Sequence, residues 1–149
     1  MTDRKVELLV PAGSLEVLKV AVDYGADAVY IGGQAYGLRA KADNFSIDEM
    51  KEAAAYAHAK NAKVYVTANI FAHNYDIDGM KTYFEQLKDT GVDAVLVSDP
   101  GIFTLAKETM PDMELHISTQ ANNTNYLTYN FWYKLGAKRV VTARDCLLY

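Results

Sequence analysis

Residues 25–31, GADAVYI, place a glycine directly before a short run of small and β-branched side chains. The same arrangement returns as GVDAVLV at 91–97 and GAKRVV at 136–141, and NAKVYV at 61–66 carries Asn in place of Gly. Gly and Asn favour the left-handed backbone conformation that ends a helix. The apolar run after them is typical of a strand that is buried on both faces of a parallel sheet. The sequence therefore repeats a helix–turn–strand unit.

The repeat divides the whole chain into alternating strands and helices. The strands are predicted at 6–10, 27–31, 63–69, 93–97, 114–118 and 138–142, and the helices at 15–24, 47–60, 77–89, 101–109 and 125–135. Strict alternation of this kind requires a parallel sheet with right-handed crossovers. An open doubly wound sheet and a (β/α)₈ barrel both satisfy it, although the turn at 11–14 lacks the glycine spacing of a dinucleotide site.

Two helix starts carry recognisable capping chemistry. Ser46 and Glu49 have the spacing of a capping box, in which each side chain accepts a hydrogen bond from the other residue's backbone N–H. Asp99 and Pro100 place a carboxylate at an N-cap and proline at the first helical position. Helices are therefore expected to begin directly after Ser46 and Asp99.

Composition limits the class of protein. The 149 residues contain no Pro/Gly/Ser-rich linker, so residues 1–149 are expected to form a single domain. The net charge of −4 gives no general attraction to nucleic acid, and a single cysteine excludes an internal disulfide. No run approaches the roughly 18 apolar residues of a membrane helix, and no leader is visible at the start. These features together predict a cytoplasmic protein without membrane contact.

A polar site is expected at the carboxyl ends of the strands, where parallel α/β folds bind their ligands. Arginine grips carboxylates with two parallel hydrogen bonds, and amide side chains orient a polar ligand. These residue types predict a pocket for a small anionic molecule. The expected ligand-binding residues are Gly13, Gly32, Gly33, Arg39, Asn69, Gln120, Asn122 and Arg144.

No catalytic residue is assigned from the sequence, although three are candidates. Glu7 lies in an apolar strand, so it is either a paired acid inside a barrel or an edge residue that faces water. His116 is as compatible with a satisfied core position as with a ligand-facing one. For Asp99 the pattern favours a helix cap over an acid. The His, Asp and Glu spacing predicts no metal site, and no serine lies in a nucleophile elbow.

Five motifs in order resemble one known family. They are ELLVPAGS at 7–14, DAVYIGG at 27–33 with GLR at 37–39, VSDPG at 97–101, HISTQAN at 116–122, and GAKRVV at 136–141 with AR at 143–144. The chain is similar to peptidase family U32 over essentially its whole length. Of the two architectures that the alternation allows, the resemblance favours the TIM-like (β/α) barrel over the open sheet. About six strands and five helices of its N-terminal part would be present here. A complete barrel takes roughly 250 residues.

The resemblance implies two activities. The family name implies proteolysis of the collagenase-like type. Other members act in hydroxylation of a tRNA wobble uridine with prephenate, of a ribosomal RNA cytidine, or of a ubiquinone precursor. Several carry an iron–sulfur cluster on cysteines beyond the region that this chain covers, and Cys146 alone cannot hold a cluster. No cofactor is therefore expected on this chain.

Three functional interpretations follow from the resemblance. The first is the N-terminal barrel segment of a tRNA-hydroxylation protein, in which Arg39 and Arg144 grip a prephenate-like dianion and tRNA is contacted mostly elsewhere. The second is a peptidase. The third is a non-catalytic fragment or one half of a split protein, which would bind a partner subunit or complementary half. Whether this chain is itself an enzyme stays open at this point.

Overall fold

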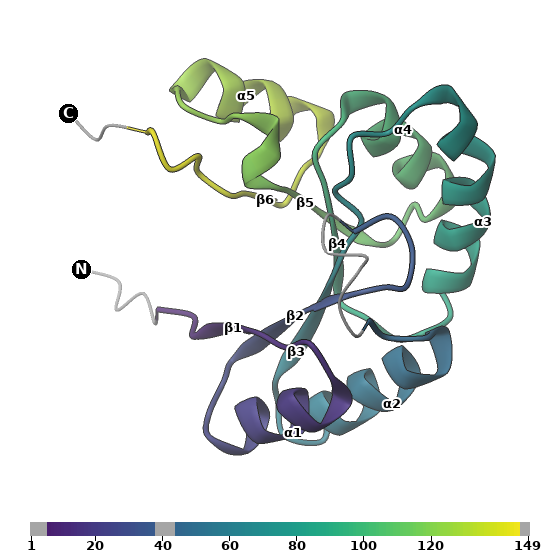
Figure 1. Ribbon diagram of the computed structural model, residues 1–149. Helices are drawn as coiled ribbons and strands as arrows, with labels where there is room; N and C mark the ends of the chain where they lie inside the picture. Colours follow the sequence, from purple (N-terminus) through teal and green to yellow (C-terminus); the bar gives the residue numbers. More distant parts are fainter. Residues whose placement is uncertain (1–5, 38–43, 147–149) are drawn as a thin grey trace.

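The computed structural model describes residues 6–37 and 44–146. Within these residues six parallel strands lie side by side in chain order, and the sheet curls into a half-barrel with five α-helices around its outside (Figure 1). The alternating unit predicted from sequence is confirmed, and the TIM-like barrel is the architecture that forms. The strands are β1 (Leu9–Pro11), β2 (Ala28–Gly32), β3 (Lys63–Thr67), β4 (Ala94–Val97), β5 (Glu114–Ile117) and β6 (Arg139–Val140). The helices are α1 (Leu15–Asp23), α2 (Ile47–His58), α3 (Ile77–Leu87), α4 (Pro100–Thr109) and α5 (Tyr126–Leu135), with 3₁₀ turns η1 (Asn74–Asp76) and η2 (Thr119–Ala121).

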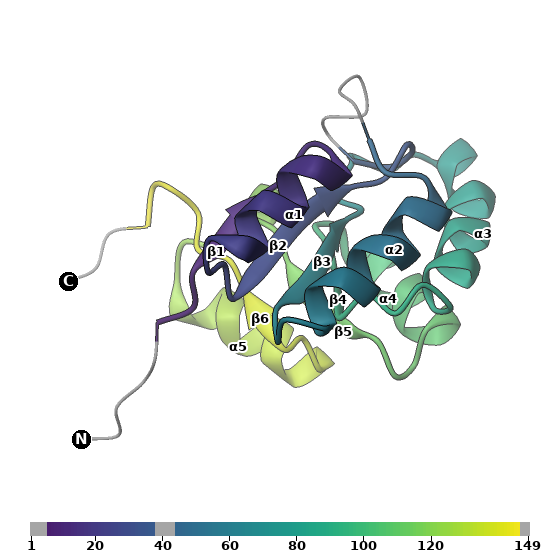
Figure 2. The ribbon, with the colours of Figure 1, turned by 90° about the horizontal axis from the view of Figure 1, so that it is seen from below.

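The strand side chains alternate between two environments. Val29, Val64 and Val95 point outward and are buried with the helices in the main hydrophobic core. Ala28 and Tyr65 belong to a smaller cluster on the opposite, concave face of the sheet. Figure 2 shows α1 and α2 lying across the convex side of the strands. The concave face is therefore left to form the interior of the barrel.

The predicted turn chemistry is confirmed at the helix ends. Gly25, Gly91 and Gly136 have φ values of +96°, +83° and +96°, a conformation that side chains with a Cβ rarely adopt. Asn61 has a φ of +59° at the position where asparagine replaces glycine. Each residue lets the chain reverse from a helix into the following strand.

Both predicted helix caps are present. The Ser46 hydroxyl accepts a hydrogen bond from the Glu49 backbone N–H at 3.3 Å, and the Glu49 carboxylate accepts one from the Ser46 N–H at 2.8 Å. The Asp99 carboxylate accepts a hydrogen bond from the Ile102 N–H at 2.9 Å, and Pro100 begins α4. The cap explains the position of Asp99 without a catalytic role.

The strands are shorter at several ends than the sequence predicts. The first strand was expected from residue 6, but β1 begins at Leu9 because the Leu8 N–H donates to the Asp27 carboxylate at 2.9 Å. The third strand ends at Thr67 rather than residue 69, where the chain turns toward α3. None of the helices within residues 6–37 and 44–146 combines the length and the apolar character that crossing a lipid bilayer requires.

The two edges of the sheet are β1 and β6, and each pairs with a single neighbour in the described chain. An ion pair connects them across the concave face. The Arg139 guanidinium donates to both carboxylate oxygens of Glu7, at 2.6 and 3.1 Å, and the Tyr65 hydroxyl donates to the same carboxylate at 3.0 Å. Glu7 is therefore a paired acid in the barrel interior, which was one of the two environments expected for it.

Candidate functional site

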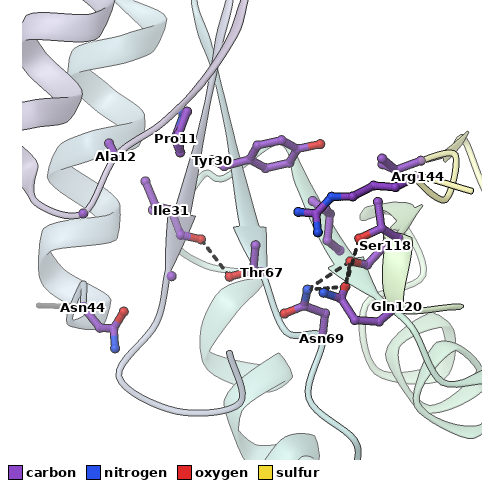
Figure 3. A pocket seen from close by; sticks show the side chains of 15 residues that line it. Pro11, Ala12, Tyr30, Ile31, Asn44, Thr67, Asn69, Ser118, Gln120 and Arg144 are labelled. Atoms are coloured by element: carbon purple, nitrogen blue, oxygen red, sulfur yellow. Dashed lines mark hydrogen bonds between the residues drawn. The ribbon is translucent and has the colours of Figure 1, made fainter. Parts of the chain in front are cut away.

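A cavity of about 400 Å³ opens at the carboxyl ends of the strands, on the concave side of the sheet (Figure 3). This is the end of the sheet at which parallel α/β folds place their ligands. Its walls come from strands β1 to β4 and from the segments that follow β1, β2, β3, β5 and β6. The lining residues are Pro11, Ala12, Gly13, Tyr30, Ile31, Gly32, Asn44, Thr67, Asn69, Leu96, Ser118, Thr119, Gln120, Val141 and Arg144.

The structure brings most of the predicted ligand-binding residues to this one cavity. Gly13, Gly32, Asn69, Gln120 and Arg144 all lie on its walls, although they come from five separate segments of the chain. Their convergence follows from the sheet, because consecutive parallel strands deliver their carboxyl ends to one edge.

Two of the predicted residues that the structure describes, Gly33 and Asn122, are not on the walls. A Cβ at Gly33 would overlap the hydroxyl of Tyr83 on α3, so Gly33 allows a close approach of this helix rather than facing the cavity. Asn122 is exposed, with a φ of +54°, at the end of η2. Arg39 lies outside the described residues.

One wall of the cavity is a hydrogen-bonded group of polar side chains. The Asn69 amide donates to the Ser118 hydroxyl and to the Gln120 carbonyl oxygen, both at 3.0 Å, and the Ser118 hydroxyl also donates to Gln120. Asn69 and Ser118 are buried, so these bonds satisfy groups that would otherwise lose hydration without compensation. The group is held in one arrangement that joins the ends of β3 and β5.

Arg144 supplies the positive charge of the cavity. Figure 3 shows its guanidinium reaching over the cavity toward Tyr30, on the same side as Ser118 and Gln120. No carboxylate of residues 6–37 or 44–146 lies within ion-pairing distance of Arg144. A cation that projects into a polar cavity without a protein anion is suited to binding an anionic ligand.

Asn123 supports the site although it is not among the residues predicted from the sequence. Its side chain is fully buried and donates to the backbone carbonyls of Ser118 and Val141 at 3.3 Å each, and it accepts from the Trp132 indole at 3.0 Å. These bonds join the end of β5 to the segment after β6 that carries Arg144. The sequence feature that could have identified it is the pair Asn122–Asn123 directly after the fifth strand, of which only one amide could face the interior.

A second polar cluster lies on the concave face, nearer the amino ends of the strands, and contains Glu7, Tyr65, His116 and Arg139. The Arg139 guanidinium beside Glu7 holds the pKa of that carboxyl below its usual range. Burial, followed by the hydrogen bond to Glu7, raises the pKa of Tyr65 to about 12. The ring of Tyr65 meets His116 edge to face, with 4.8 Å between ring centroids. Glu7 and His116, the two remaining catalytic candidates, are thus not among the cavity walls.

His116 is almost completely buried. Its Nε2 lies 3.6 Å from a carboxylate oxygen of Glu114, and its Nδ1 has no hydrogen-bond partner in the described part of the chain. Burial, together with the positive charge of Arg139, lowers the pKa of His116. The imidazole is therefore held neutral near pH 7.

The residues present do not fit an iron–sulfur cluster. Such clusters use four cysteine thiolates, and the sequence contains one cysteine. The Cys146 thiol lies 3.5 Å from both the Tyr129 hydroxyl and the Thr124 carbonyl. Residues 6–37 and 44–146 also contain no group of three or more His, Cys, Asp or Glu side chains that could hold a metal ion.

Comparison with known proteins gives the chain a family. The sequence profile of peptidase family U32 matches residues 13–148. The chain is 50% identical over 142 residues to tRNA hydroxylation protein P1 of Bacillus subtilis, covering 95% of this chain and 34% of that protein. It is 43% identical over 143 residues to an uncharacterized protease of Methanocaldococcus jannaschii, with 96% and 34% covered.

The fold agrees with this assignment. The solved U32 peptidase Mk0906 superposes with a TM-score of 0.74 over 95% of this chain and 60% of that one, at 16% identity. The chain spans about a third of the length of the two relatives named above. The chain belongs to peptidase family U32.

Proposed function

We propose that this chain is the N-terminal barrel segment of a protein that hydroxylates a tRNA uridine, and that its cavity holds a prephenate-like dianion. The observation that carries the proposal is Arg144, which has no carboxylate partner among the described residues and reaches over a cavity with a hydrogen-bonded polar wall. Half of the aligned positions are identical to a tRNA hydroxylation protein, which supports the reaction class. The proposal places the protein in the cytoplasm with its tRNA.

The cavity suits a small carboxylate in size and in charge. Its volume of about 400 Å³ lies within the range of about 300–1,000 Å³ that is usual for small-molecule pockets. Arg144 can bind one carboxylate through two parallel N–H donors. Helix α1 begins two residues after Gly13, so the positive end of its dipole also lies beside the cavity. Arg39 is proposed as the grip for the second carboxylate.

Peptide-bond hydrolysis is the second candidate, supported by the family name and by the M. jannaschii relative. It requires a nucleophile that is activated by a neighbouring base. Ser118 is the buried hydroxyl of the cavity, and it donates to the Gln120 amide instead of to a histidine. The described geometry therefore favours binding of a polar ligand over acyl transfer.

The same proposal includes a complementary half that completes the barrel, as a continuation of the chain or as a partner subunit. Exposed large apolar side chains gather at both edges of the curled sheet. They are Val6 and Leu8 before β1, Val17 and Val20 on α1, Tyr24 directly after it, and Tyr126, Leu127, Phe131, Tyr133 and Leu135 on α5. Two further β/α units between β6 and β1 would cover them. The tRNA and any cluster-binding cysteines would be contacted or supplied mostly by that half.

Thermal unfolding with and without prephenate tests the ligand. At a prephenate concentration of about 100 times Kd, binding stabilises the folded state by about 2.7 kcal/mol. For a domain of this size that raises Tm by about 5–10 °C. Arg144→Ala should abolish the shift. Lys138→Ala removes an exposed positive charge that is not on the cavity walls and should retain it. If prephenate does not raise the Tm of the wild type, or raises the Tm of Arg144→Ala equally, the cavity does not bind this ligand through Arg144.

A further inference from the structure

We infer that the loop between β3 and α3 is a stacking site for an unpaired nucleobase, formed by Phe71, His73 and Tyr75. The inference rests on the proposed function, because it gives the RNA substrate a contact on this chain. The loop leaves β3 at its carboxyl end, and its residue Asn69 forms part of the cavity wall. A base that is held here would lie at the rim of the candidate site.

The three rings are presented to solvent. Phe71 is 68% exposed and Tyr75 is 82% exposed, and 63% of the His73 side chain is accessible. The rings of His73 and Tyr75 are already stacked, with centroids 5.3 Å apart and planes 3° from parallel. Two parallel rings at the surface leave a flat outer face on which another planar ring can stack.

Local hydrogen bonds hold the stacked rings of His73 and Tyr75 in place. The Asp76 carboxylate accepts a hydrogen bond from the His73 N–H at 2.8 Å and starts the 3₁₀ turn that leads into α3. The Ile70 N–H donates to the Tyr36 carbonyl at 3.3 Å, which joins this loop to the one after β2. A preformed stack loses little conformational freedom when a ligand binds.

The charges within the loop favour a base over a phosphate group. Residues 70–80 contain no lysine or arginine, and Asp76 and Asp78 are both in this segment. Phosphate contacts need positive side chains, whereas the face of a nucleobase is uncharged and stacks on aromatic rings. The site therefore suits an unpaired base whose phosphates are bound elsewhere, and it does not suit a duplex, whose bases are already stacked on one another.

Fluorescence anisotropy with a short labelled single-stranded oligouridine tests the inference. Stacking of one base on an aromatic side chain predicts that Tyr75→Ala binds about tenfold more weakly, while Tyr75→Phe keeps the wild-type affinity. Tyr133→Ala is the matched control, because Tyr133 is 77% exposed and belongs to a different element, α5. It should bind as the wild type does.

Three results would overturn the inference: no measurable binding by the wild type, an unchanged affinity in Tyr75→Ala, or equal weakening in Tyr133→Ala. The prephenate shift, measured on the same variants, separates this result from the proposed function. If Tyr75→Ala keeps its RNA affinity while the wild type still shows the prephenate shift, the stacking site is wrong and the anion pocket stands. If the shift is absent and Tyr75→Ala still weakens RNA binding, the stacking site stands without the pocket.

Discussion

Breaking the Glu7–Arg139 ion pair is expected to lower the free energy of unfolding by about 2 kcal/mol. Hydrogen bonds to charged groups contribute about 1.5–3 kcal/mol each when water is excluded, and exposed ion pairs about 0–1 kcal/mol. The two side chains here are 30% and 35% exposed, and the guanidinium makes two hydrogen bonds to the carboxylate. The contribution of this half-exposed pair should lie between these two ranges, at about 2 kcal/mol. Its loss would lower Tm by about 4–8 °C.

Urea unfolding of Glu7→Gln, Arg139→Gln and the double variant measures the coupling between the two residues directly. Asp23→Asn is the control, because the Asp23–Lys60 pair is more exposed, at 43% and 44%, and should contribute less to stability than the Glu7–Arg139 pair. A coupling energy below about 0.5 kcal/mol would show that the edges of the half-barrel are held together by something other than this pair.

Two further predictions concern buried groups. The pKa of His116 is lowered from its ordinary 6.5, so the unfolded chain takes up a proton there while the folded chain does not, and stability is lost as pH falls below 6.5. Urea midpoints between pH 7 and 5 should fall less steeply in His116→Gln than in the wild type, and parallel curves would contradict this. Gly33→Ala should cost about 1–3 kcal/mol by overlap with Tyr83, and a smaller loss is expected in a Tyr83→Phe background. Urea unfolding measures both losses. If Gly33→Ala lowers the free energy of unfolding equally in the wild type and in Tyr83→Phe, overlap with the Tyr83 hydroxyl is not the cause.

The sequence predicts those parts of the fold that depend on neighbouring residues. Gly25 and Gly91 end helices in the left-handed conformation, and Ser46 caps α2 through local hydrogen bonds, so short stretches carry the whole signal. The parallel order of the sheet follows because each β-branched run is separated from the next by one helix. Choosing the barrel over an open sheet required the family resemblance, since both use the same alternating unit.

The candidate site was predictable only in its location. The carboxyl ends of the strands identify Asn69, Gln120 and Arg144 as wall residues, because strand direction fixes where they lie. Gly33 was grouped with Gly32, yet neighbouring strand residues face opposite sides, and Gly33 packs against α3. Periodicity also could not identify Arg139 as the partner of Glu7, because that contact depends on the curvature of the complete sheet.

The separation of Glu7 and Arg139 has a consequence for how the protein is made. Strand order equals chain order, so each strand can pair with the one synthesised just before it. Glu7 instead meets a residue 132 positions later. At translation rates of about 5–20 residues per second, the Glu7 carboxylate waits roughly 7–26 s for its partner. Neighbouring strands can therefore pair in the order of their synthesis, whereas this ion pair can form only once β6 has been translated.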